Sequence, residues 1–189
     1  MDRETAAIQD WQRLVRENSG APVGQKLRVV NSYFNDFKYV EDPELYGRED
    51  YWATMHETLG RRSGDCEDLA IAKYFTLREM DLAEKNMRIT YVIPVRTRRP
   101  HMVLTYGGED EEPLVLDTMV RVLLPVSRRD DLVPVYSFNT EGYWLARKDE
   151  QWRGKRVGSA ARLSRWRELL ERMRREDTFF RKPPTPTGG

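Results

Sequence analysis

The sequence predicts an α+β fold in which helices come first and an antiparallel sheet follows. Apolar residues recur at helical spacing through the first part of the chain, whereas runs rich in β-branched residues begin only near residue 88. Short connections rich in Gly and acids then separate neighbouring β-like runs, which is typical of hairpins. Helices grouped in one part of the chain and strands in another are characteristic of the α+β class.

Three helical segments precede the first strand. Residues 8–15 and 25–37 each place their apolar side chains on one stripe, so each is expected to pack one face on a core. A loop rich in proline, glycine and acids follows at 41–50. Residues 66–77 are apolar nearly all round, which is typical of a central, buried helix. Asp65 directly precedes this helix and is its expected N-cap.

Strands dominate the second half. The expected strands are 88–95, 101–106, 113–119, 121–126 and 143–147. A Gly-Gly-Glu-Asp-Glu-Glu connection joins the second and third of these as a hairpin. A last helix is expected around 163–173, where an apolar stripe faces the core and alternating Arg and Glu face solvent.

Length and composition restrict the class of protein. A chain of 189 residues favours one domain, here 1–180, followed by a Pro-rich tail at 181–189 that is expected to be disordered. The net charge of +1 provides no global basic field, and the Arg-rich stretch 153–181 is interleaved with acids, so we expect no nucleic-acid partner. No apolar run is long enough to span a bilayer. The start lacks a signal-peptide pattern, so we expect either a cytoplasmic protein or a mature chain whose leader was removed.

Cys66 is the only cysteine, which excludes an intramolecular disulfide and a four-thiolate zinc site. It falls in the first turn of the central helix, where free N–H groups and the helix dipole lower the pKa of a thiol. This setting recurs among nucleophilic cysteines. A lone cysteine is nevertheless often an inert, buried residue, so its neighbours have to decide between the two interpretations.

The predicted hairpin supplies a partner pair for Cys66. If its turn lies midway, His101 is opposite Asp117 and Val103 is opposite Val115, with Cβ atoms about 5 Å apart. An aspartate across from a histidine can hold its ring, as in a catalytic triad. The alternative is a surface ion pair, and a slip of one residue would break the pairing. The other histidine, His56, is expected to be a surface or packing residue.

Three acids, Asp65, Glu67 and Asp68, surround Cys66. Their negative charge raises the pKa of a thiol, against the effect of the helix dipole. A bound divalent cation would resolve this conflict, and clustered carboxylates suit Ca²⁺. The alternative is simple capping of the helix, which the spacing alone favours.

The segment GDCEDLAIAKY at 64–74 resembles the signature of the bacterial transglutaminase-like cysteine proteinases, the LapG family. Further segments resemble the family in the same order along about residues 25–145: Leu27 to Asn31 with Asn35, Asp50 to Trp52, His101 to Leu104, Leu114 to Asp117, Arg129, Asp131 to Leu132, Pro134 to Asn139, and Trp144. Two positions depart from the pattern. Thr118 stands where the family usually has an aromatic or amide residue, and Thr54 to His56 replace a more Pro-like segment.

The resemblance implies a papain-like or transglutaminase-like core and a Cys-His-Asp endopeptidase, with the triad Cys66, His101 and Asp117. In that mechanism His101 takes the thiol proton, the thiolate forms an acyl-enzyme, and water hydrolyses it. Asp117 orients His101, and the backbone N–H of Cys66 is a candidate oxyanion donor. A second donor is expected near Trp52, which is at least as well explained as a core aromatic residue.

The resemblance also implies Ca²⁺ held by Asp65, Glu67 and Asp68, and a periplasmic location. It implies a large surface adhesin as substrate, cut near its N-terminal retention module at a di-alanine site to promote biofilm dispersal. An inner-membrane receptor of LapD type would hold the enzyme inactive when cyclic di-GMP is high. Two alternatives stay open, namely a transglutaminase-like acyl transferase and a catalytically silent binding module, although an intact triad argues against the second.

Overall fold

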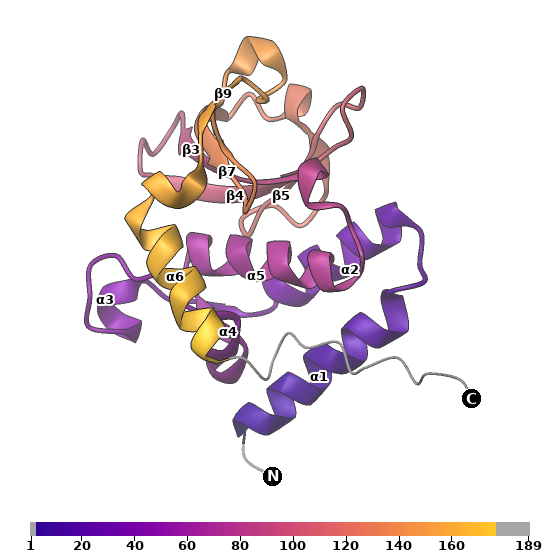
Figure 1. Cartoon of the computed structure of the whole chain (residues 1–189), viewed down its shortest axis with the longest axis vertical. Helices are drawn as coiled ribbons and strands as arrows, with labels where there is room; N and C mark the ends of the chain where they lie inside the picture. The colour runs from indigo at the N-terminus through magenta and orange to yellow at the C-terminus, as the bar shows by residue number, and fades with distance from the viewer. Residues whose placement is uncertain (1–2, 177–189) are drawn as a thin grey trace.

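A computed structural model describes residues 3–176, so the expected tail at 181–189 lies outside the described residues (Figure 1). The predicted α+β class is confirmed. The α-helices of this part of the chain are α1 (Arg3–Asn18), α2 (Val23–Asn35), α3 (Asp42–Leu45), α4 (Met55–Arg61), α5 (Cys66–Glu79) and α6 (Ser164–Arg175). None of them is both long and apolar enough to cross a membrane.

Two sheets accompany these helices. The strands are β1 (Lys38–Tyr39), β2 (Ser63–Gly64), β3 (Met87–Pro94), β4 (His101–Tyr106), β5 (Leu114–Leu116), β6 (Leu124–Pro125), β7 (Leu132–Phe138), β8 (Tyr143–Leu145) and β9 (Lys155–Gly158). β1 and β2 form a small parallel pair, and the other seven form an antiparallel sheet in the order β6-β5-β4-β3-β7-β8-β9. The predicted grouping of strands after helices therefore holds for the main sheet.

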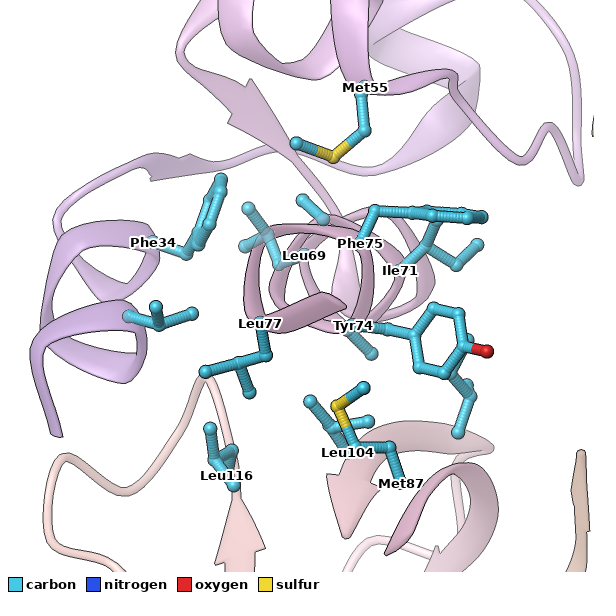
Figure 2. Packing of buried hydrophobic residues seen from close by; sticks show 14 of the residues in the cluster. Phe34, Met55, Leu69, Ile71, Tyr74, Phe75, Leu77, Met87, Leu104 and Leu116 are labelled. Carbon is cyan, nitrogen blue, oxygen red and sulfur yellow. The ribbon is translucent and has the colours of Figure 1, made fainter. Parts of the chain in front are cut away.

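Helix α5 is the centre of the molecule, as its all-round apolar sequence predicts. It packs against β4 and β3 on one side and against α2 and α4 on the other (Figure 1). Figure 2 looks along α5 and shows Phe34 of α2, Met55 of α4 and Leu104 of β4 on three different sides of it. Because neighbours enclose the helix, its first residue, Cys66, is held in a fixed position at the edge of the core.

The β4–β5 hairpin forms, but the predicted register is wrong. Leu104 pairs with Leu116 and Thr105 with Val115, so Val103 does not oppose Val115. The strands instead close at Gly107, where an added Cβ would lie 2.8 Å from Cα of Pro113. With the turn closed here, each residue of β4 pairs with a residue two positions further along the chain than predicted. A shift of two leaves every side chain on its predicted face.

Other elements differ from the prediction in extent. The expected strand 121–126 is reduced to β6, and the acidic loop 41–50 contains the short helix α3. Strands β7 and β9 were not predicted. A proline interrupts the apolar alternation of β7. Beside this proline the pairing with β3 shifts register, because Tyr91 pairs with Tyr136 and Val92 pairs with Pro134, which leaves Val135 of β7 as the extra residue of a β-bulge.

Candidate active site

A cleft of roughly 370 Å³ lies between the start of α5 and the start of β4. Cys66 and His101 both line it, and Trp52, Tyr91 and Tyr136 form much of its aromatic wall. Tyr91 and Tyr136 stack with ring centroids 4.9 Å apart. Two of the three residues that the sequence singled out for chemistry therefore share one cavity, although they come from different layers of the fold.

The local sequence explains how Cys66 reaches this cleft. β2 keeps the chain extended through Gly64 and Asp65, and α5 begins at Cys66. Gly64 is required because a Cβ there would lie 2.7 Å from Cβ of Asp68. Asp65 occupies the N-cap position, as predicted, but its side chain makes no capping hydrogen bond.

The Cys66 thiol is protonated in this environment. Its side chain is buried, and Sγ donates a hydrogen bond to Oε2 of Glu67 at 3.0 Å. Burial raises the pKa of the Cys66 thiol well above its usual value, and the charges of Glu67 and Asp65 raise it further. The lowering of the thiol pKa expected from the helix start is therefore outweighed, first by burial and then by the acids, whose effect their sequence positions suggested.

His101 and Asp117 form a buried pair, with His101 Nε2 2.7 Å from Asp117 Oδ1. Their side chains are 6% and 1% exposed, so this is not the surface ion pair considered as the alternative. In the observed register Asp117 follows the last paired residue of β5 and reaches His101 diagonally, a separation that side chains can bridge. Because Nε2 is held by Asp117, Nδ1 is the ring nitrogen left for proton exchange in the cleft.

Arg129 completes this pair and was not recognised as a site residue from the sequence. It is 3% exposed and donates from Nη2 to Asp117 Oδ2 at 2.7 Å and to Asp131 at 2.9 Å. Burial alone would raise the pKa of Asp117, but hydrogen bonds and charge from His101, with the backbone N–H of Met119 and Arg129, hold it well below its usual range. Asp117 is therefore ionised. The only sequence signal for Arg129 was its resemblance to the corresponding position of the LapG family.

Acidic side chains gather behind Cys66. One oxygen from each of Asp42, Asp65 and Asp68 lies within 4.8 Å of the others, and Asp42, Asp50 and Glu67 form a second such group. The three predicted ligands are thus divided between the two groups, and Asp42 belongs to both. The sequence signal for Asp42 was its position in the acidic loop, which α3 brings beside the start of α5.

One carboxylate oxygen each of Asp42, Asp65 and Asp68 is buried without a hydrogen-bond partner. The other oxygens of Asp42 and Asp68 accept the backbone N–H groups of Tyr51 and Ala53 at 2.5 and 2.7 Å. Burial and mutual repulsion raise the pKa of Asp42 to about 6 and that of Asp65 to about 10. Orphaned oxygens that converge in this way fit a hard cation with oxygen ligands.

Trp52 and His56 have different positions relative to the cleft. Trp52 lines the cleft and also stacks on Phe138 with ring centroids 5.5 Å apart, so it is both a wall of the site and a core aromatic residue. Its carbonyl accepts a hydrogen bond from Arg172 of α6. His56 contacts Glu4 of α1 at 2.6 Å, away from the cleft, as expected for a surface or packing residue.

A cysteine at a helix start that shares a cleft with a strand-borne histidine and its buried aspartate is typical of papain-like and transglutaminase-like thiol enzymes. Residues 4–151 match the profile of the bacterial transglutaminase-like cysteine proteinases, and the chain belongs to that family.

The chain is also similar to solved structures of LapG from Legionella pneumophila. The EGTA-treated form is 38% identical, with 92% of this chain and 91% of that one covered and a TM-score of 0.82. Another LapG structure is 37% identical over 92% and 89%, with a TM-score of 0.81. The calcium-bound form is 38% identical over 92% of each chain, with a TM-score of 0.79. Among curated protein sequences, none matches this chain.

Proposed function

We propose that this protein is a calcium-dependent periplasmic endopeptidase that cuts the N-terminal region of a large surface adhesin. The cut would release the adhesin and promote biofilm dispersal, under the control of a cyclic di-GMP receptor of LapD type. The observation that carries the proposal is the cleft that Cys66 and His101 both line, with Nε2 of His101 held by the buried Asp117. Membership of the cysteine proteinase family and the similarity to LapG support the peptidase activity, and the adhesin and the receptor are proposed by analogy with that family.

The chemistry follows from these three side chains. The thiol proton of Cys66 passes to Nδ1 of His101, and the thiolate attacks the scissile carbonyl carbon. The backbone N–H of Cys66 points from the helix start toward the developing oxyanion. His101 then returns the proton to the leaving amine, which breaks the peptide bond and leaves a thioester. A water molecule, deprotonated by His101, hydrolyses the thioester and restores the thiol.

Asp117 has two tasks in these steps. Its Oδ1 accepts the Nε2 proton of His101, which fixes the ring orientation and leaves Nδ1 as the base. Its negative charge stabilises the imidazolium that forms when His101 takes the thiol proton. The contacts with His101, the backbone N–H of Met119 and Arg129 together keep Asp117 ionised, and so this side of the cleft is ready for proton transfer before substrate binds.

A calcium ion bound by Asp42, Asp65, Asp68 and Glu67 would supply positive charge beside the thiol. Without it, burial and the nearby acids raise the pKa of the Cys66 thiol and favour its protonated form. The buried, unpartnered oxygens of Asp42, Asp65 and Asp68 support such an ion. The solved LapG relatives include a calcium-bound and an EGTA-treated form, which also supports calcium for this chain.

The deciding experiment is incubation with the N-terminal region of an adhesin from the same genome, with Ca²⁺ or with EGTA. The wild-type protein is expected to produce two fragments with Ca²⁺, whereas EGTA and the Cys66→Ala variant are expected to give none. Melting temperatures would confirm that the variant is folded. Cleavage by Cys66→Ala would contradict the mechanism, and a product joined to an added primary amine would indicate acyl transfer in place of hydrolysis.

A further inference from the structure

Lys73 is a charged residue enclosed in the core, and none of the steps above uses it. It lies on α5, two turns beyond Cys66, and its side chain is 0% exposed. Its Nζ donates to Oδ1 of Asn31 and to Oδ1 of Asn35, each at 2.8 Å. Within residues 3–176 the hydrogen-bond partners of this ammonium group are therefore two amide oxygens of α2.

The other ends of the two amides contact the segment that carries Asp117. Nδ2 of Asn35 donates to the backbone oxygen of Asp117 at 2.9 Å, and Nδ2 of Asn31 donates to the backbone oxygen of Arg121 at 3.1 Å. Because the ammonium group of Lys73 can only donate, it binds the oxygen of each amide and orients the NH₂ group toward the segment. The lysine thus determines the orientation of both asparagine side chains.

The segment 117–121 needs such support. It connects β5 to β6 without regular secondary structure, and Met119 within it is 75% exposed. The carboxylate of Asp117 is held by His101 and Arg129, but its backbone oxygen has only the amide of Asn35 to fix it among the hydrogen bonds described for residues 3–176. A shift of this backbone would move the carboxylate away from Nε2 of His101.

We propose that Lys73 is a positioning residue that acts through Asn35 on the backbone of Asp117 and so aims the carboxylate at His101. The inference rests on the proposed function, in which Asp117 orients the catalytic histidine. In this proposal α5 positions both parts of the site, since the same helix carries Cys66 in its first turn and, further along, Lys73, which acts on Asp117. Supporting hydrogen bonds of this kind fix the geometry of reacting groups in many sites.

The chemistry of the position favours this role over simple packing. Burying an amine is costly, and an apolar side chain of similar length would fill the same space without that cost. Burial lowers the pKa of Lys73 to about 7, although the charge of Asp117 opposes this. Both the ammonium and the neutral amine have at least two N–H groups, so Lys73 can hold both asparagines in either state.

Two matched variants of α2 test the proposal. Asn35→Asp and Asn31→Asp each keep an oxygen for Lys73 and each replace an NH₂ donor by a carboxylate oxygen. Only Asn35→Asp removes the donor to the backbone of Asp117. We expect it to lower kcat for adhesin cleavage by about tenfold or more, with KM little changed, and Asn31→Asp to lower it by less than about threefold.

Lys73→Met provides the third arm, because it removes the donors and keeps a side chain of similar length. We expect a loss of kcat like that of Asn35→Asp. The nitrogen-15 signals of the His101 ring, which report where its proton lies, should change in Lys73→Met and Asn35→Asp and stay unchanged in Asn31→Asp. A purely structural role would instead lower the melting temperature of all three variants without this distinction.

Equal losses of kcat in the two asparagine variants, or unchanged His101 signals in folded Lys73→Met, would overturn the proposal. The His101 signals can be measured in protein that has no substrate. If the wild-type protein cleaved no adhesin, the proposed function would fail, while the ring signals would still decide whether Lys73 and Asn35 position Asp117.

Discussion

The two sides of the cleft differ in how many of their buried carboxylate oxygens have hydrogen-bond partners within the described part of the chain. On the sheet side, Asp117 receives hydrogen bonds from His101 and Arg129, and its pKa is held well below the usual range. On the helix side, Asp65 and Asp68 each bury an oxygen without a partner. The acids there raise the pKa of the Cys66 thiol, which lies between them.

This difference separates two requirements of one reaction. The histidine and its aspartate are oriented by residues that are all present in the chain, so this half is organised in advance. The nucleophile half is incomplete, because its acids oppose the thiolate that the reaction needs. A cation would act on the second half and leave the first unchanged, so the proposed requirement for calcium would be a property of the nucleophile side alone.

The largest effect is expected from a substitution on the sheet side of the cleft, where His101 and Asp117 are already oriented. Asp117→Asn should lower kcat by about 10³–10⁴-fold, as loss of the acid does in other triads, because a neutral amide does not stabilise the imidazolium. Cleavage of the adhesin fragment under saturating substrate measures this. The matched control is Asp131→Asn, which removes the more exposed partner of Arg129 and should change kcat by less than about twofold. A variant Asp117→Asn with more than a tenth of the wild-type kcat would show that His101 does not depend on this carboxylate.

The second prediction concerns the effect of adding or removing calcium at the acids on the helix side. Calcium at a hundred times its dissociation constant should stabilise the fold by about 2.7 kcal/mol, which corresponds to roughly 5–10 °C in melting temperature. Calorimetry in Ca²⁺ and in EGTA measures the difference. Asp68→Asn should remove most of it, whereas Asp149→Asn, an exposed acid paired with Arg147, should retain it. Equal melting temperatures of the wild-type protein in the two buffers would exclude a calcium site that stabilises the fold.

The third prediction concerns pH. Without the ion, burial raises the pKa of Asp42 to about 6 and that of Asp65 to about 10, so the folded chain holds protons that the unfolded chain releases above about pH 4. The stability of the calcium-free protein should therefore fall as pH rises from about 5 to 8. Calcium binds the ionised carboxylates, so the difference in melting temperature between the loaded and calcium-free protein should widen over the same range. A difference that is constant or narrows would contradict the raised pKa values.

The layers of the fold were predictable because each depends on a local pattern. The apolar surface of α5 and the β-branched runs of β3 and β4 are visible in the sequence. The hairpin register was not predictable, because it depends on the approach of Gly107 to Pro113 across the turn. Strand β7 was missed because Pro134 interrupts its apolar alternation, and the β-bulge beside this proline exists only in the pairing with β3, which is distant in the sequence.

The site shows the same limit. Cys66 was identified by its place at a helix start, and the contact between His101 and Asp117 was anticipated through a register that proved wrong. Arg129 and Asp42 were missed as site residues because only tertiary packing brings Arg129 to Asp117, and the start of α3 with Asp42 to the acids around Cys66. Local patterns therefore indicated the candidate catalytic residues and the three acids beside Cys66, whereas Arg129 and Asp42 required the structure.

The smallest effect is expected on the reactivity of the Cys66 thiol when a neighbouring acid is neutralised. Glu67→Gln removes one charge beside Cys66 and weakens the acceptor of its hydrogen bond, but burial, the larger cause of the raised pKa of Cys66, remains. We therefore expect alkylation of Cys66 by iodoacetamide in EGTA to accelerate by only about three- to fivefold near neutral pH. Glu49→Gln is the matched control, since Glu49 also lines the cleft but makes no described contact with the thiol. At saturating calcium, Cys66 of the wild-type protein should be alkylated as fast as Cys66 of Glu67→Gln, because the ion neutralises the same charge. If the two rates still differed in calcium, the ion would not act on the nucleophile through Glu67.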